Sequence, residues 1–490
     1  MRCKYAWWIG CLSWLLWHGL LPAAPPAPTQ QPLLCAIDLA IGEQQEVELS
    51  NGERARVRLV ELEEQRDSVM SAVHEARVTV EVNGERAVIG AALYHLPVAV
   101  GGLQVDCPIT KGPVANSHID HWGLVKDARL RLWPASSPWI TPGTMSYPVR
   151  QKWFATGTSM ANEPVSPRPG GKLYYHSGLD IGGSEGLVEV TAATDGLIVS
   201  AGNHVLPELG DTPIEPRYDV VYILDHRGWY YRYSHLQMIA VDVIPGRKVQ
   251  QGQLIGRLGK EGASGGWTHL HFEIKSRQPS GRWGTQEAYA FLWEAYIRQF
   301  SPERIAVARP GHHVLGGETV VLDGSKSWSA QGPIARYEWI LADGRTATGA
   351  KVEQRYDRPG TYSEVLKIVD ASGQAAFDFA RVTVVNPVQP SVWPIRLHAT
   401  YYPTFGLQAG DPVTFKVRAF GSTHGEEVWD LGDGSPPQTT RSDGNVQALA
   451  KDGYAVLTHR YRQAGDYLVL VQRQDRDGTR AMAHLHVHVE

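Results

Sequence analysis

The sequence predicts a multidomain protein built mainly from β-structure, and three observations lead to this prediction. The chain has 490 residues, more than a single hydrophobic core supports, so three or four domains are expected. It holds 50 Gly, 31 Pro, 16 Trp and 20 Tyr but few long helical patterns, a balance typical of strands and turns. Short runs in which apolar and polar residues alternate recur along the chain, as expected for strands with one buried face.

Composition and charge exclude several classes of protein. Hydrophobic residues make up 43% of the chain, which excludes a disordered protein. After the first 25 residues no apolar run is long enough to cross a membrane, so a polytopic membrane protein is excluded. The net charge is −4 and no block of basic residues stands out, so nucleic acid is not an expected partner.

The N-terminus has the layout of a secretory signal. Arg2 and Lys4 precede an apolar stretch over 5–21, and small residues and prolines follow. We therefore expect residues 1–24 to be a signal peptide and the chain to be exported, to a periplasmic, cell-surface or extracellular location. Because 17 apolar residues approach the lower limit for a membrane span, an uncleaved N-terminal anchor is the alternative.

Residues 31–145 predict an N-terminal β domain. Alternating runs there are interrupted by Asn-Gly pairs at 51–52 and 83–84, the strongest short-range signal for a hairpin. Cys35 and Cys107 are the cysteines left after the signal. In an exported chain they either form one disulfide or remain separate buried thiols.

A second unit, 146–302, carries the residues with chemical potential. It ends in an apolar and aromatic stretch over 286–300 that predicts a helix. Just before this stretch, residues 268–274 alternate as a strand does. His269 and His271 therefore share one face of that strand, and the apolar residues between and after them point to the core.

His176, Asp180 and His271 are the residues that we expect to bind a metal. A catalytic zinc site needs about three protein ligands and an open position for water. Such an ion polarises a carbonyl group and lowers the pKa of water. Gly178 permits a close backbone approach between the first two ligands.

Other polar residues are expected to have structural or solvent-exposed positions rather than a chemical role. The C-terminal alternation predicts the last strand of a sandwich with three histidines on one face, His484, His486 and His488. A solvated loop is expected over 118–121, with His118 and His121 exposed. Glu273 is expected at a solvated strand end rather than behind a metal ligand. Tyr233, expected on the same face as His235, either lines the cleft or packs within the sheet.

The order of these motifs resembles the lysostaphin-type, or LytM-type, zinc metallopeptidases. The matching segments lie within about 146–300 and are His176-Ser-Gly-Leu-Asp180, Tyr233-Ser-His235-Leu, Val249-x-x-Gly-Gln-x-Ile-Gly256 and His269-Leu-His271-Phe-Glu. The resemblance implies an antiparallel β-sheet peptidase core and one zinc ion per chain on His176, Asp180 and His271. It also implies that His235 and His269 are the catalytic histidines, and that zinc-activated water hydrolyses a peptide bond.

Two stretches depart from the simplest members of that family. Residues 203–219 form a Pro-containing insertion that could wall one side of the cleft. The stretch before the first ligand, 153–170, is also long. Asn162 or Glu163 within it could block the zinc in a latent form.

The remaining residues, 306–386 and 390–490, repeat one order of elements, which predicts tandem β-sandwiches. Trp339 and Trp429 are expected in the two cores. Both units resemble PKD domains, which are immunoglobulin-like sandwiches, although the second carries an insertion at 438–453. The resemblance implies spacers, or modules that bind carbohydrate or protein ligands.

Together these features predict an exported zinc endopeptidase that acts on peptidoglycan cross-links or stem peptides. The family resemblance implies that substrate, whereas the residues themselves imply only metal-assisted peptide hydrolysis. Two alternatives stay open. One is a secreted protease that cuts Gly-rich proteins, and the other is a surface-binding or adhesion protein whose peptidase domain is a non-catalytic scaffold.

Overall fold

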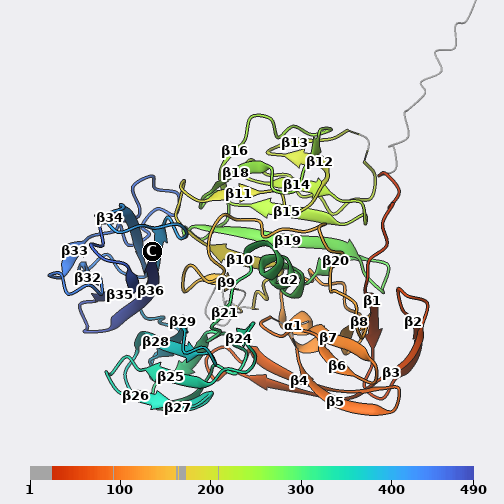
Figure 1. Ribbon diagram of the computed structural model, residues 1–490, viewed down its shortest axis with the longest axis horizontal. Helices are drawn as coiled ribbons and strands as arrows, with labels where there is room; N and C mark the ends of the chain where they lie inside the picture. Colours follow the sequence, from red (N-terminus) through yellow and green to blue (C-terminus); the bar gives the residue numbers. More distant parts are fainter. Residues whose placement is uncertain (1–24, 92, 162–163, 165–172, 208) are drawn as a thin grey trace, which may run out of the picture.

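The computed structural model describes residues 25–490 apart from residues 92, 162–163, 165–172 and 208 (Figure 1). The expected signal over 1–24 lies outside the described residues, as do Asn162 and Glu163. Strands dominate the described part of the chain, which confirms the predicted multidomain, mainly β fold. No helix in the described ranges is long and apolar enough to cross a membrane.

The N-terminal unit consists of two four-stranded antiparallel sheets, ordered β1-β8-β7-β6 and β2-β3-β4-β5. Both predicted Asn-Gly hairpins form, one between β2 and β3 and one between β4 and β5. Cys35 and Cys107 are free thiols, so the disulfide alternative is wrong. The alternative of separate buried thiols is confirmed for Cys107, whereas Cys35 is only half-buried. The elements are β1 (Cys35–Leu39), β2 (Gln44–Glu48), β3 (Arg54–Arg66), β4 (Val73–Val82), β5 (Glu85–Gly90), β6 (Val98–Val100), β7 (Leu103–Thr110), α1 (Lys111–Asn116) and β8 (Ala128–Pro134).

The central unit is built on a nine-stranded sheet with the order β13-β12-β14-β15-β19-β10-β9, to which β17 and β20 add at β12 and β19. A three-stranded sheet, β11-β18-β16, completes it. The predicted helix forms as α2. The elements are β9 (Ser159–Ala161), β10 (Leu179–Gly182), β11 (Glu189–Thr191), β12 (Gly196–Ala201), β13 (His204–Val205), β14 (Val221–Leu224), β15 (Tyr230–Ser234), β16 (Leu236–Ile239), β17 (Lys248–Val249), β18 (Leu254–Leu258), β19 (His269–Arg277), β20 (Trp283–Gln286) and α2 (Tyr289–Phe300).

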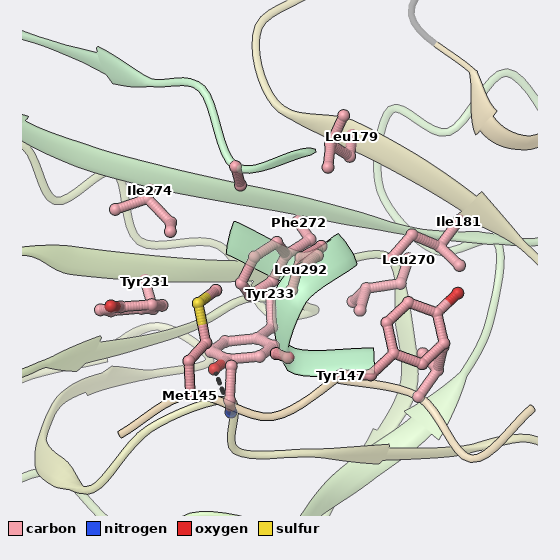
Figure 2. Packing of buried hydrophobic residues seen from close by; sticks show 14 of the residues in the cluster. Met145, Tyr147, Leu179, Ile181, Tyr231, Tyr233, Leu270, Phe272, Ile274 and Leu292 are labelled. Atoms are coloured by element: carbon pink, nitrogen blue, oxygen red, sulfur yellow. Dashed lines mark hydrogen bonds between the residues drawn. The ribbon is translucent and has the colours of Figure 1, made fainter. Parts of the chain in front are cut away.

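The core of the central unit lies under β19, as its alternation predicted. Leu270, Phe272 and Ile274 are fully buried and pack in one hydrophobic cluster (Figure 2). Alternation along the strand places the two histidines on its opposite face. Tyr231 and Tyr233 from β15 and Leu292 from α2 belong to the same cluster. Because these apolar side chains are closely packed, they hold the backbone of β19 in place. The polar side chains on the opposite face of β19 are therefore also fixed in position.

Two sandwiches follow, and their main sheets are continuous. Strand β28 of the first sandwich pairs in parallel with β36 of the second. This pairing joins the two sandwiches into one nine-stranded sheet with the order β22-β29-β28-β36-β35-β32-β33, to which β25 and β26 are attached. Smaller sheets β21-β24, β23-β27 and β30-β31-β34 complete them. Trp339 and Trp429 have no exposed surface, which confirms their predicted core positions. This continuous sheet fixes the two sandwiches relative to each other.

The first sandwich contains β21 (Arg304–Ile305), β22 (His312–Leu315), β23 (Glu318–Asp323), β24 (Trp328–Ser329), β25 (Arg336–Ile340), β26 (Thr346–Thr348), β27 (Lys351–Tyr356), β28 (Gly360–Val369) and β29 (Ala375–Val385). The second contains β30 (Arg396–Tyr402), β31 (Val413–Phe420), β32 (Glu427–Asp430), β33 (Gln438–Thr440), β34 (Ala455–His459), β35 (Gly465–Gln474) and β36 (Arg480–Val489). The three C-terminal histidines lie on β36, the last strand, as predicted. Figure 1 shows the second sandwich beside the N-terminal end of β19.

Candidate active site

The three residues predicted to bind a metal lie together on the polar face of the central sheet. Antiparallel pairing of β10 with β19 places Asp180 opposite His271, and His176 precedes β10 by one tight turn. His176 Nε2 is 2.8 Å from His271 Nδ1 and 3.1 Å from Asp180 Oδ1, and His271 Nδ1 is 3.0 Å from the same carboxylate oxygen. Their ligand atoms all fall within 4.8 Å of one another.

Gly178 is required by this turn. Its φ is +80°, and a Cβ atom there would lie 2.6 Å from the carbonyl oxygen of Phe272. Any other residue would therefore push the His176 turn away from β19, because real Cβ atoms do not approach a backbone oxygen so closely. The close approach expected between the first two ligands is confirmed.

The electrostatics of this cluster favour an ionised carboxylate beside the imidazoles. Burial raises the pKa of Asp180, but the neighbouring His176 and His269 and hydrogen bonds from the imidazoles hold it well below its usual range. Burial lowers the pKa of His271, but contacts with Asp180 and Glu273 raise it overall. In the described part of the chain, the buried Nδ1 of His176 has no hydrogen-bond partner.

His235 and His269 face each other beside the metal-ligand cluster. Their ring centroids are 4.5 Å apart, and the His235 ring is 6.2 Å from that of His271. His235 Nδ1 lies 2.6 Å from the backbone oxygen of Glu261, and His269 Nδ1 lies 3.0 Å from that of Trp267. Because a carbonyl oxygen only accepts, each Nδ1 carries the proton and each Nε2 presents a lone pair.

The surroundings keep both imidazoles neutral. Burial lowers the pKa of His235, and burial lowers the pKa of His269 well below the usual value. The Trp267 ring stacks on His269 at 3.7 Å between centroids and 18° between planes. The backbone N–H of His235 donates to Asp219 Oδ2 over 2.9 Å, which fixes the turn that carries it.

The backbone at His235 explains why one expectation about Tyr233 was wrong. His235 adopts φ +68°, which ends β15 and breaks the strand alternation. Its side chain therefore faces the site, whereas Tyr233 points into the core, packs against Phe272 and accepts a hydrogen bond from the N–H of Ala193 (Figure 2). Of the two readings of Tyr233, packing within the sheet is confirmed and lining the cleft is not.

The expected solvation of Glu273 was also wrong. Its side chain is fully buried, accepts a hydrogen bond from Thr285 Oγ1 and brings Oε2 within 3.8 Å of His271 Nε2. The pairing of β19 with β20 and β15 covers this end of the strand, which the sequence pattern alone did not indicate. Glu273 thus lies behind a predicted metal ligand, where carboxylates orient the imidazole.

The loop over 118–121 is only partly the exposed loop that was expected. His118, Ile119 and Asp120 are exposed as expected, whereas His121 is half-buried, and both histidines pack against the ring of Tyr174. His121 also lines the cleft in front of the metal-ligand cluster. This placement arises from contacts between distant segments, so no local sequence signal marked it.

A cleft of about 680 Å³ opens over these histidines. The end of the insertion over 203–219 contributes Arg217 to its wall, in line with the expectation that this insertion flanks the cleft. Arg217 pairs with Asp219 and lies 3.3 Å from His235 Nδ1. The opposite wall comes from the sandwiches, through residues including Trp393, Arg396 and His398.

The second sandwich also forms hydrogen bonds with the glycine loop, 262–266, that leads into β19. Arg418 donates to the carbonyl oxygen of Gly266, and Asn445 donates to that of Gly265. A Cβ atom on Gly266 would lie 2.1 Å from Asn445 Oδ1, so the contact depends on the missing side chain. Asn445 belongs to the insertion at 438–453, and this insertion therefore braces the site.

The buried hydroxyl of Tyr454 extends this support to Thr268, the residue before His269. The backbone N–H of Thr268 donates to Tyr454 Oη over 2.9 Å, and the same hydroxyl lies 2.7 Å from His398 Nδ1. Tyr454 and His398 both belong to the second sandwich. The sequence predicted that this domain is a spacer or a ligand-binding module, and nothing local indicated that it supports the strand with the two histidines.

Replacing Tyr454 with phenylalanine is expected to loosen the start of β19. The change leaves the buried N–H of Thr268 without an acceptor, which costs about 1–3 kcal/mol. Hydrogen exchange measured by mass spectrometry should speed up in peptides covering 265–269. Tyr467→Phe is the matched control, because its hydroxyl donates to the backbone oxygen of Gln463 at the surface of the same domain. Equal exchange rates in the two variants would contradict the idea that the Tyr454 hydroxyl stabilises the start of β19.

Comparisons with known proteins agree with this arrangement. Residues 174–282 match the model of peptidase family M23, and residues 302–384 and 398–489 each match a PKD domain model. Collagenase ColA of Clostridium perfringens (strain 13 / Type A) is 30% identical over 81 residues. That match covers 16% of this chain, and the chain spans only 7% of the length of the collagenase.

Solved structures are similar to parts of the chain. The catalytic domain of the prophage-encoded M23 protein EnpA of Enterococcus faecalis, solved as a mutant, is 22% identical, with a TM-score of 0.19. The match covers 26% of this chain and 85% of the EnpA chain. Csd3 of Helicobacter pylori is 14% identical over 51% of this chain and 80% of its own, with a TM-score of 0.21. The chain therefore carries a peptidase domain of family M23, the LytM/lysostaphin family, followed by two PKD domains.

Proposed function

We propose that the chain is an exported zinc-dependent endopeptidase that cleaves peptide bonds in peptidoglycan cross-links or stem peptides. One observation carries the proposal. The ligand atoms of His176, Asp180 and His271 converge next to His235 and His269, whose Nε2 lone pairs are free to take up a proton. This combination supports metal-assisted hydrolysis, and the M23 match supports a peptide as the substrate.

The three converging residues fit a zinc ion. Two imidazole nitrogens and a carboxylate oxygen, all electron-rich, lie 2.8–3.1 Å apart, an arrangement that needs protons or a cation between them. Ligands in a tetrahedral zinc site are about 3.3 Å apart, which is close to this spacing. His176, Asp180 and His271 would hold the ion, and when bound it would polarise the peptide carbonyl and lower the pKa of water.

The chain's own residues supply the proton transfers. His269 and His235 are neutral and fixed through Nδ1, so each Nε2 can accept a proton as water attacks the carbonyl carbon. Once protonated, an Nε2–H can donate to the developing oxyanion and then return the proton to the leaving amine. Trp267 limits rotation of the His269 ring by stacking on it.

Gly-rich proteins are the second candidate substrate. The partial similarity to a collagenase favours this candidate, since collagens are rich in glycine. The non-catalytic adhesion alternative is less favoured, because all five residues predicted for metal binding and catalysis are present and adjacent. The PKD domains would then contribute carbohydrate or protein binding alongside the peptidase.

The test compares the purified full chain as isolated, after chelation and after zinc is restored. Elemental analysis is expected to find one zinc ion per chain. Mass spectrometry should find new peptide termini in digested peptidoglycan, and this cleavage should be lost on chelation and regained with zinc. Digests of gelatin and pentaglycine test the second candidate substrate, Gly-rich proteins. Cleavage of gelatin alone would favour Gly-rich proteins. A chain that binds peptidoglycan without zinc and cleaves none of these substrates would contradict the proposal.

A further inference from the structure

Trp267 holds His269 through both its side chain and its backbone. The indole ring stacks on the imidazole with 3.7 Å between centroids, and the backbone oxygen of Trp267 lies 3.0 Å from His269 Nδ1. The direction of the His269 Nε2 lone pair therefore follows the position of Trp267. A general base transfers a proton only over hydrogen-bond distance, so this direction bears on the rate of the proposed reaction.

The segment that carries Trp267 gives its ring little support. Gly265 and Gly266 precede it with φ values of +71° and +87°, a conformation that glycine adopts freely. The Trp267 side chain is half-buried and lines the cleft. Contacts from other parts of the molecule must therefore hold the indole ring on His269.

A contact of this kind comes from His398, which lies on β30 of the second PKD domain. The centroids of the Trp267 and His398 rings are 5.3 Å apart and the ring planes meet at 66°, within the range of favourable edge-to-face aromatic pairs. His398 is only 3% exposed. The indole ring thus lies against an imidazole of its own domain, on which it stacks, and against an imidazole of the PKD domain, which restrains it.

His398 is itself held in position. Its Nδ1 lies 2.7 Å from Tyr454 Oη, and the Tyr454 ring meets the imidazole edge-to-face at 5.7 Å and 80°. At the other ring nitrogen, a Cβ atom on Gly182 would lie 3.3 Å from Nε2. Gly182 pairs with His269 across β10 and β19, so the missing side chain leaves room for His398 beside the strand pair that carries the proposed base.

We propose that His398 is a positioning residue of the M23 site: it holds the Trp267 ring against His269, and the second PKD domain thereby sets the rate of peptide hydrolysis. Because His398 is almost completely buried, it acts on the reaction through Trp267 rather than by touching the peptide. The effect on rate rests on the proposed function, whereas the contact between the rings can be measured without substrate or zinc.

Two substitutions of His398 separate the ring contact from the hydrogen bond with Tyr454. His398→Phe keeps an aromatic ring against Trp267 but removes the ring nitrogens. His398→Asn keeps a polar atom close to the position of Nδ1 but removes the rest of the ring. If the ring contact positions Trp267, His398→Phe should behave like the unmodified chain and His398→Asn should not. A domain that only docks through the hydrogen bond would give the opposite order.

The position of the indole ring is measured by fluorine NMR of the full-length chain labelled with 5-fluorotryptophan. The chain holds 16 Trp, so Trp267→Phe is used to identify the Trp267 signal by its loss. This signal should be one narrow line in the unmodified chain and in His398→Phe. In His398→Asn it should broaden or split, as expected for a ring that exchanges between positions. A narrow, unshifted line in His398→Asn would overturn the proposal.

Cleavage of a soluble muropeptide by the full chain provides the second measurement. His398→Asn is expected to lower kcat by about 10- to 100-fold, because a displacement of about 1 Å in an active site can cost about 10²-fold in rate. KM and the zinc content from elemental analysis should stay unchanged, and His398→Phe should keep most of kcat. An unchanged kcat in His398→Asn, or a change in KM alone, would also overturn the positioning role.

His459→Ala is the matched control. His459 is also a histidine of the second PKD domain that meets an aromatic ring, that of Tyr461 at 4.7 Å, and it is not among the described residues that line the cleft. It should leave the Trp267 signal and kcat unchanged. Should thermal unfolding show that His398→Asn does not fold, Trp267→Leu removes the stacked ring from the M23 side. An unchanged kcat in Trp267→Leu would overturn the proposal.

The two measurements separate this proposal from the proposed function. A chain that cleaves no peptide, but whose Trp267 signal responds to His398→Asn and not to His398→Phe, contradicts the peptidase and leaves the contact between the rings standing. An active chain whose Trp267 signal and kcat both ignore His398→Asn leaves the peptidase standing and overturns the positioning role.

Discussion

Replacing His271 with alanine is expected to abolish both tight zinc binding and peptide cleavage. His271 supplies one of three converging ligand atoms, and its partner Asp180 lies only 3.0 Å away. Removing it leaves two ligands, fewer than a catalytic zinc site needs. We expect less than one-tenth of the zinc content of the unmodified chain by elemental analysis, and activity reduced by about 10³-fold or more in peptidoglycan digests analysed by mass spectrometry.

The C-terminal histidines provide the matched control for this change. His488 lies in a second His-x-His alternation, but it is exposed on β36, and its Nδ1 is 2.8 Å from Asp466 Oδ1. His488→Ala should therefore keep one zinc ion per chain and full activity. If His271→Ala retains its zinc and its activity, or if His488→Ala loses them, the metal site lies elsewhere in the chain.

Replacing His269 with alanine is expected to separate catalysis from metal binding. His269 Nε2 is 3.4 Å from Asp180 Oδ2, next to the three proposed ligands but outside that set. Zinc content should stay near one ion per chain, while kcat falls by about 10²- to 10⁴-fold, the usual contribution of a general base. His235→Ala should behave in the same way, because its ring faces that of His269.

The pH profile tests the same assignment with a definite sign. A general base acts only when neutral, so activity falls as pH drops through its pKa. Because the pKa values of His235 and His269 are both lowered, the acid limb of kcat/KM should lie below the ordinary histidine pKa of about 6.5. An acid limb above that value, or a profile unchanged in both alanine variants, would contradict a role for these histidines as bases.

Much of the fold was predictable because the decisive signals are local. Asn-Gly pairs marked two hairpins, and an apolar and aromatic stretch marked α2. Alternation along β19 assigned Leu270 and Phe272 to the core and the two histidines to the opposite face. Strand period and turn chemistry depend on neighbouring residues, so they can be read without knowledge of the rest of the chain.

The same alternation failed where the backbone left the strand. Tyr233 and His235 were expected on one face, but the left-handed conformation at His235 turns its side chain to the site. Glu273 was expected in solvent, but β15 and β20 cover it on both sides. In both cases a residue outside the local strand pattern takes part: Asp219 accepts from the N–H of His235 and holds its turn, and Thr285 donates to Glu273.

The sequence by itself determined the domain order, the strand carrying His269 and His271, and the residue types of the proposed metal site. Only the tertiary structure decided that the second PKD domain contacts the Gly262–Gly266 loop through Arg418 and lines the cleft through Arg396. The physical reason is that strand periodicity constrains one segment at a time. The cleft is formed by side chains from all four domains, and their proximity arises only when those domains pack together.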